Sequence, residues 1–313
     1  MRDYEILLTI LPCRLVKWRK PTGPLELVTS VPRSEIVFVW FAAGPAATAA
    51  FVLSRIFHKK IVVVAGGSEV SPEKEIHGSG IRSAIRFLTT RIILNNSDLV
   101  IAVSYFNKTE ILAVSKPKRL NVVYNGIDTN EYRPSGDGKI FDGLTVAAGR
   151  NRAQFTRKGL DRFAQLARCL PTRRFVAVGN LPARREWKRR FPRNVQITGP
   201  VPNDILLYYF QKSRFYCQLS RHEQFGVALV EAMATGCVPI VSDSGALPEV
   251  VGPCGIVVRN GDPLVASTAI EEFRSHCEEL GNLTRKRVQT LYSIEERKMR
   301  FKEILNQLLC NTL

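Results

Sequence analysis

Short apolar runs alternate with amphipathic segments through the first 125 residues of the chain. The runs are rich in β-branched residues and end at glycines or polar residues, as buried strands do. The pattern predicts strand, turn and helix over 36–53, a strand over 59–70, a helix over 80–96, a strand over 97–104, a helix over 105–114 and a strand over 119–125. Such alternation predicts a parallel sheet that helices cover on both faces.

A second series of the same kind follows a linker rich in Gly, Asp and Asn over 125–143. It predicts strands over 143–149, 173–179, 194–199, 214–220 and 238–243, and helices over 158–170, 204–213 and 227–236. The pattern restarts, and 313 residues are long for one core. We therefore predict a short N-terminal Rossmann-like domain over 1–134 and a C-terminal Rossmann-like domain over 135–291.

The last segment, 292–313, is predicted to be a helix that packs back on the N-terminal domain. Ser293 and Glu296 have the spacing of a capping box, and an apolar stripe follows them. The predicted fold class is therefore α/β, with two doubly wound domains facing each other across a cleft. Ligands bind such domains where the carboxyl ends of the strands meet.

One stretch resembles a membrane span, because none of the eighteen residues from 36 to 53 is charged. Its first half is β-branched and aromatic, Ala-Ala-Gly-Pro interrupts the middle, and its second half is rich in Ala. Strand, turn and helix therefore explain this stretch better than a span does. The apolar residues near the amino terminus, 7–12, are too few for a signal peptide, and the basic residues follow them.

The composition changes this picture in two ways. The formal net charge is +17, from 45 Lys and Arg against 28 Asp and Glu, which favours an anionic partner. The seven cysteines are scattered and form no C-x-x-C pair, which argues against a disulfide framework or a zinc site. We expect a cytoplasmic protein.

Two carboxylates flank the start of the predicted helix 227–236. Glu223 lies in the loop after the strand 214–220, where functional groups collect in such folds. Glu231 lies at the edge of the apolar stripe of that helix and could accept two hydrogen bonds from a vicinal diol such as a ribose. The alternatives are an acid favoured by the helix dipole for Glu223 and a solvated face for Glu231.

A basic segment follows the strand 143–149. It contains Arg150, Arg152, Arg157 and Lys158. Cations at the carboxyl end of a strand suit a diphosphate, because Arg binds phosphate in a fork and Lys acts as a point charge. A basic surface loop is the alternative.

Residues 220–251 resemble the signature of family-4 glycosyltransferases of the GT-B fold. That signature has seven residues between two acids, followed by EAMA-x-G and a GxxPE segment, and this chain has Glu223, Glu231, EAMATG and GALPE. Further segments match in order between about residues 36 and 270, including SDLVIAVS and VVYNGIDTNEYRP. The combination is specific, although each piece alone is weak.

The resemblance implies roles for residues of the C-terminal domain. It implies that Glu231 binds the nucleotide ribose and that Glu223 contacts hydroxyls of the donor sugar. It implies that the backbone amides of Phe225, Gly226 and Val227 approach the sugar and phosphate. It also implies that Arg150 and Lys158 neutralise the departing diphosphate, so that no metal and no cofactor besides the donor is needed. It further implies that the enzyme retains anomeric configuration.

The sequence departs from the family pattern at several places. The interval from Arg150 to Lys158 is longer than usual, so Arg152 or Arg157 could share the phosphate role. The glycine-rich loop near the amino terminus is not recognisable. The candidates for the acceptor side are Gly66, Gly67, Glu69 and His77. Many relatives have His-Gly where this chain has Gly66 and Gly67, and Asp where it has Glu69. His77 is a histidine in the loop that follows.

The main functional prediction is a metal-independent hexosyltransferase that moves a sugar from a nucleotide-diphosphate sugar to a glycan or lipid-linked acceptor. The alternatives are a sugar-nucleotide epimerase or phosphorylase on the same scaffold, and a non-catalytic basic protein that binds nucleic acid. No nucleic-acid motif with interleaved aromatics supports the last one.

The predicted helix over 80–96 adds a candidate partner. Its cations and apolar residues are Arg82, Arg86, Arg91, Ile81, Ile85, Phe87, Leu88 and Ile92. A basic amphipathic helix can lie in a lipid headgroup layer, which predicts peripheral binding to an anionic membrane surface. The alternative is that this helix only covers the parallel sheet.

Overall fold

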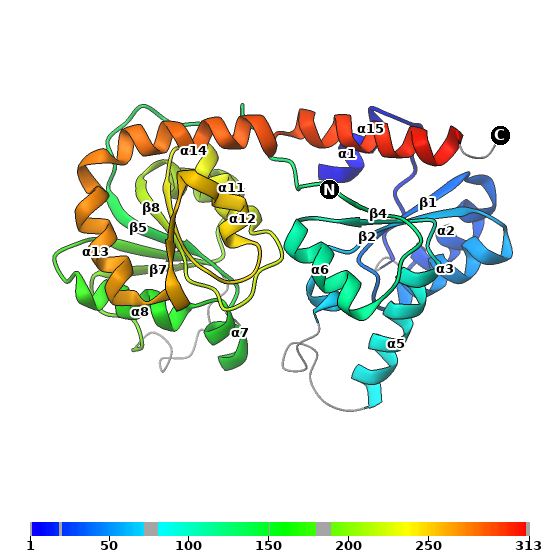
Figure 1. Cartoon of the computed structure of the whole chain (residues 1–313), viewed down its shortest axis with the longest axis horizontal. Helices are drawn as coiled ribbons and strands as arrows, with labels where there is room; N and C mark the ends of the chain where they lie inside the picture. The colour runs from blue at the N-terminus through cyan, green and yellow to red at the C-terminus, as the bar shows by residue number, and fades with distance from the viewer. Residues whose placement is uncertain (1, 19–20, 72–80, 150, 180–188, 311–313) are drawn as a thin grey trace. The chain divides into compact units, whose positions relative to one another are not determined.

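A computed structural model describes residues 2–18, 21–71, 81–149, 151–179 and 189–310 of the chain. The chain divides into two compact units, shown in Figure 1. Unit 1 comprises Met1–Asn125 and Glu295–Leu313, and unit 2 comprises Gly126–Ile294. The sequence placed these limits at 134/135 and 291/292, nine residues after and three residues before those of the structure. We describe each unit by itself.

Unit 1 contains a sheet of four parallel strands in the order β1-β2-β3-β4. The strands are β1 (Ile36–Trp40), β2 (Lys60–Val64), β3 (Leu99–Ala102) and β4 (Leu120–Val122). The helices are α1 (Arg2–Leu8), α2 (Gly23–Ser30), α3 (Pro45–Ile56), α5 (Ile81–Asn96), α6 (Tyr105–Val114) and α15 (Ile294–Cys310), with short 3-10 turns at Val31–Arg33 and Ser68–Val70. In Figure 1, α1 and α15 lie on one side of these strands and α3, α5 and α6 on the other.

The C-terminal helix α15 belongs to unit 1. The ring of Phe301 on α15 meets Phe38 of β1 with 5.7 Å between the ring centroids. The buried guanidinium of Arg297 donates hydrogen bonds of 2.6 and 2.7 Å to the two carboxylate oxygens of Asp3. The same guanidinium also donates to the carbonyl of Val123 at 2.9 Å. Since a buried charge is costly without partners, these contacts explain why α15 is held against the N-terminal residues.

The stretch that imitates a membrane span folds as β1 and α3, as the sequence predicts. Pro45 stands at the first turn of α3, where a missing N–H costs nothing, and Gly44 precedes it with a φ of 93°. Among the residues that the structure describes, no helix is long and apolar enough to cross a bilayer.

Unit 2 contains six parallel strands in the order β10-β9-β8-β5-β6-β7. The strands are β5 (Phe141–Val146), β6 (Phe175–Val178), β7 (Val195–Gly199), β8 (Ser213–Gln218), β9 (Val238–Ser242) and β10 (Ile256–Val258). The helices are α7 (Arg152–Arg157), α8 (Leu160–Cys169), α10 (Asn203–Gln211), α11 (Val227–Ala234), α12 (Leu247–Val251), α13 (Pro263–Phe273) and α14 (Cys277–Leu291), with 3-10 turns at Gly252–Cys254, Arg259–Gly261 and Arg274–His276.

The strand order of unit 2 reverses between β5 and β8. The chain first adds β6 and β7 on one side of β5, and then adds β8, β9 and β10 on the other. Parallel sheets bind ligands at such a reversal, outside the carboxyl ends of the strands. The loops after β5 and β8 are the segments that carry Lys158 and Glu223.

Gly159 fixes how these two loops meet. Its φ is +67°, and a Cβ built on it would lie 2.0 Å from the carbonyl oxygen of Leu219. The N–H of Arg221 donates to the carbonyl of Arg157 at 2.8 Å beside it. Only glycine combines this conformation with this close approach.

We expect Gly159→Ala to lower the free energy of unfolding by more than about 2 kcal/mol, because it adds left-handed strain to a clash with backbone. Urea denaturation measures the change. Gly138→Ala is the matched control, since a Cβ at Gly138 meets nothing within 4 Å. Equal stability of the two variants would contradict the proposed contact.

Candidate functional site

Glu223 and Lys158 form an ion pair at the strand reversal of unit 2. Lys158 Nζ lies 2.8 Å from Glu223 Oε2, and both side chains are partly buried, with exposures of 27% and 15%. The side-chain amide of Gln218, the last residue of β8, donates to the same Glu223 oxygen at 2.8 Å. One carboxylate oxygen thus accepts from a cation and an amide, so Glu223 is held by the residue that follows α7 and by the last residue of β8.

The backbone around Glu223 is also held. Its carbonyl accepts a hydrogen bond of 2.9 Å from the N–H of Ala246. Gly245 has a φ of +65°, and a Cβ there would lie 2.3 Å from the Glu223 carbonyl oxygen. The GALPE segment of the signature therefore packs directly on the backbone of the Glu223 loop.

Glu231 lies in the middle of α11 and is only 7% exposed. Every residue of α11 from Leu229 to Ala234 is buried, so the alternative of a solvated helix face for Glu231 is wrong. Tyr216 of β8 is fully buried, which raises the pKa of its hydroxyl well above the usual value, and the charges of Glu223 and Glu231 raise that pKa further.

The three residues predicted to offer backbone amides open α11. Phe225 is buried and meets the ring of Tyr292 edge to face, with 5.6 Å between the centroids. Gly226 precedes the helix with φ 89° and ψ 65°, and Val227 is the first helical residue. The first N–H groups of a helix have no partner within it, and they suit an anion.

The basic segment after β5 is partly described. Arg150 lies outside the described residues. The residues from Arg152 to Arg157 form the short helix α7, which Asn151 caps through a hydrogen bond of 2.9 Å to the N–H of Gln154. This inserted helix accounts for the long interval before Lys158, which follows its last turn. Arg152 is exposed and Arg157 half-buried, and their share in phosphate binding stays a prediction.

The residues predicted for the acceptor side lie in unit 1, after β2. The N–H of Gly67 donates to the buried carboxylate of Glu69 at 3.3 Å. Burial raises the pKa of Glu69, while backbone N–H groups and the charge of Arg86 act in the other direction. Gly66 packs on Val103. Glu69 thus binds the backbone of the loop that contains Gly67. His77 lies outside the described residues.

Sequence reasoning missed two residues beside Glu223. Gln218 is buried, and its Oε1 has no hydrogen-bond partner within the described residues. That oxygen is 3.5 Å from where a Cβ on Gly226 would stand, so it lies beside the start of α11. The available signal for Gln218 was an amide among the apolar residues near the carboxyl end of the predicted strand 214–220. Tyr216 gave no signal, because its aromatic ring fits any buried strand.

Comparisons with known proteins confirm the predicted class. Residues 144–276, which lie in unit 2, match the family model described as glycosyl transferases group 1. Sucrose-phosphate synthase from Thermosynechococcus elongatus superposes with a TM-score of 0.76 at 19% identity, over 96% of this chain and 82% of the other. HepE from Anabaena, in complex with UDP and glucose, superposes with a TM-score of 0.76 at 16% identity, over 97% and 88%. The chain has the fold of GT-B glycosyltransferases.

Two curated relatives are similar over parts of the chain. A GDP-mannose:cellobiosyl-diphosphopolyprenol alpha-mannosyltransferase from Xanthomonas campestris is 32% identical over 159 residues, 46% of this chain and 40% of the relative. A phosphatidylinositol N-acetylglucosaminyltransferase protein from Arabidopsis thaliana is 26% identical over 220 residues, 65% of this chain and 48% of the relative. The chain thus spans less than half the length of these relatives. The predicted resemblance to GT-B glycosyltransferases is confirmed, and family 4 is compatible with it.

Proposed function

We propose that this protein is a retaining glycosyltransferase, of the hexosyltransferase type, that uses a nucleotide-diphosphate sugar as donor. The observation that carries the proposal is the ion pair of Lys158 and Glu223 at the strand reversal of unit 2. A carboxylate that binds sugar hydroxyls and a cation that meets the diphosphate must lie close together, because the bond that breaks joins the sugar to the phosphate.

The residues have complementary roles in this reaction. Lys158 stabilises the negative charge that develops on the diphosphate as the sugar departs, which is where a fixed cation accelerates such a step. Glu223 accepts hydrogen bonds from hydroxyls of the donor sugar, and the unmatched Oε1 of Gln218 offers a further acceptor beside it within the described part of the chain. The carboxylate of Glu231 accepts hydrogen bonds from the ribose hydroxyls. The backbone N–H groups at the start of α11 bind the phosphate. Arg150 is assigned to the same phosphate site from its position in the sequence alone.

We propose a glycan or lipid-linked acceptor and a reaction at the cytoplasmic face of a membrane. The names of the two relatives support this, since one names a diphosphopolyprenol and the other a phosphatidylinositol. Nothing about these acceptors is transferred residue by residue. Gly66, Gly67, Glu69 and His77 remain the candidates for the acceptor side.

A thermal-shift screen over UDP, GDP, ADP and their sugars tests the donor class. A nucleotide at 100 times its dissociation constant stabilises the folded state by about 2.7 kcal/mol, so one base should raise the melting temperature clearly. Transfer assays with and without acceptor then separate a transferase from an epimerase or phosphorylase. Absence of any nucleotide shift, together with salt-sensitive binding to arbitrary DNA, would contradict the proposal.

We expect sugar transfer to persist in EDTA. The proposed counter-charge for the diphosphate comes from Lys158 and the arginines of the same segment, and the sequence offers no D-x-D pair for a metal that would replace them. The measurement is initial rate with increasing EDTA, followed by addition of magnesium or manganese. Loss of turnover that either metal restores would show that a metal carries the charge instead.

A further inference from the structure

Helix α5 carries apolar residues on two opposite faces. Thr90, Ile93 and Leu94 are buried in the core of unit 1, and Phe87 packs against it. Four other large apolar residues are exposed: Ile81 by 79%, Ile85 by 57%, Leu88 by 57% and Ile92 by 44%. At 3.6 residues per turn these four fall within about 60° of one another and span about 16 Å of helix. We call them the α5 stripe.

The structure thus divides the apolar residues that the sequence placed together on this helix. One set covers the sheet, and the α5 stripe points away from it. In Figure 1 the beginning of α5 is the end of the helix that lies furthest from the strands. A helix that is apolar on both faces is normally covered on both, so the α5 stripe needs a second partner.

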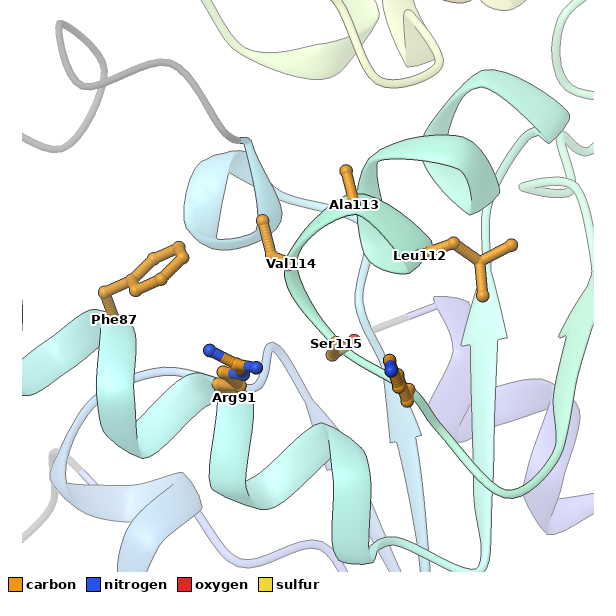
Figure 2. A pocket seen from close by; sticks show the side chains of 7 residues that line it. Phe87, Arg91, Leu112, Ala113, Val114 and Ser115 are labelled. Carbon is orange, nitrogen blue, oxygen red and sulfur yellow. The ribbon is translucent and has the colours of Figure 1, made fainter.

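The described helix α5 itself contains cations and no acids. Arg86 and Arg91 of α5 are exposed, and the sequence 81–97 contains no Asp or Glu. A groove beside the helix is lined by Phe87 and Arg91 from α5 and by the end of α6 up to Lys116. Figure 2 shows the Arg91 side chain reaching into the space between Phe87 and Ser115. The backbone N–H of Lys116 donates to the Asn95 side chain at 2.6 Å, which ties the backbone of Lys116 to α5.

We propose that the α5 stripe and this groove form a binding surface for an anionic lipid bilayer. The four aliphatic side chains enter the boundary between headgroups and acyl chains, and Arg91 and Lys116 meet lipid phosphates. A positively flanked aliphatic stripe is the pattern that interfacial helices share. The formal net charge of +17 adds long-range attraction to the same surface. This surface lies in unit 1 and does not depend on the proposed sugar transfer.

Co-sedimentation of the full chain with vesicles tests the proposal. The probes are vesicles of phosphatidylcholine alone and of equal parts phosphatidylcholine and phosphatidylglycerol, both without any glycolipid and without nucleotide. We expect binding only to the anionic vesicles, and we expect it to fall as salt rises, because salt screens the lipid charge.

Matched variants assign the binding to α5. Leu88→Glu should weaken partitioning into the vesicles at least tenfold. Arg91→Gln should weaken it about fivefold, since that is the change in partitioning that one cation near an anionic surface contributes. Leu264→Glu is the control, because Leu264 is 66% exposed on α13 of unit 2 and its loss should leave partitioning unchanged. Unchanged melting temperatures show that the variants fold.

Three results would overturn the proposal. The first is a protein that stays in the supernatant at low salt with the anionic vesicles. The second is a dimer without lipid that Leu88→Glu dissociates, which would assign the α5 stripe to a second copy of the chain. Equal partitioning of Leu88→Glu and Leu264→Glu would also count against it.

Discussion

Replacing Lys158 by alanine should reduce turnover by about 100-fold or more while leaving the fold intact. Removing one preorganised group that stabilises transition-state charge typically costs 10²–10³ in rate. The measurement is kcat and KM for sugar transfer with the donor that the screen identifies. We expect the larger change in kcat, because the charge on the diphosphate develops as the bond breaks.

Lys212→Ala is the control for Lys158→Ala. Lys212 also lies 2.8 Å from a carboxylate, that of Asp137, but it immediately precedes β8 and so lies at the opposite edge of the sheet from Glu223. It should transfer sugar at the normal rate. If both lysine variants lose activity equally, the loss comes from stability or total charge, and Lys158 has no special role.

Replacing Glu231 by glutamine should weaken nucleotide binding by about 10- to 100-fold, since a hydrogen bond to a charged group contributes about 1.5–3 kcal/mol. Glutamine keeps the volume of this buried side chain, whereas Glu231→Ala would also leave a cavity in the packed helix α11. The measurement is nucleotide affinity by isothermal titration calorimetry. Unchanged affinity would remove Glu231 from the ribose role.

Asp142→Asn provides the comparison for Glu231→Gln. Asp142 is an equally buried carboxylate of unit 2, and it sits near the start of β5, where it accepts from Arg274 at 3.0 Å. Its loss should lower stability without lowering nucleotide affinity. A fall in affinity for both variants would indicate a general effect of removing a buried charge.

The sequence predicted the α/β class and the main elements because strand and helix periods are strong over 36–53 and 213–243. It also predicted that Glu223 and the basic segment with Lys158 each follow a buried strand, since both come after apolar runs. It did not predict that they touch, because that contact depends on β8 pairing with β5, which are far apart in sequence. Strand order is a tertiary property that no local pattern contains.

Three other features show where local patterns stop. The inserted helix α7 is only six residues long, too short for a periodic signal. The pairing of Gln218 with Glu223 depends on a side-chain hydrogen bond. Helix α5 has apolar residues on both faces, so the sequence does not show which face packs on the sheet and which is exposed. Exposure of the individual residues was needed for that.

The membership of α15 in unit 1 has a consequence for synthesis of the chain. The helix that covers Phe38 and binds Asp3 through Arg297 is made only after all of residues 126–294. At 5–20 residues per second that delay is about 10 to 35 s. Unit 2 is continuous in sequence and can close while it leaves the ribosome, whereas the part of the unit 1 sheet that α15 covers stays exposed until that helix is made. The amino-terminal half of this protein is therefore the last part to finish folding, and a ribosome that stalls within 126–294 leaves an apolar sheet face for chaperones to shield.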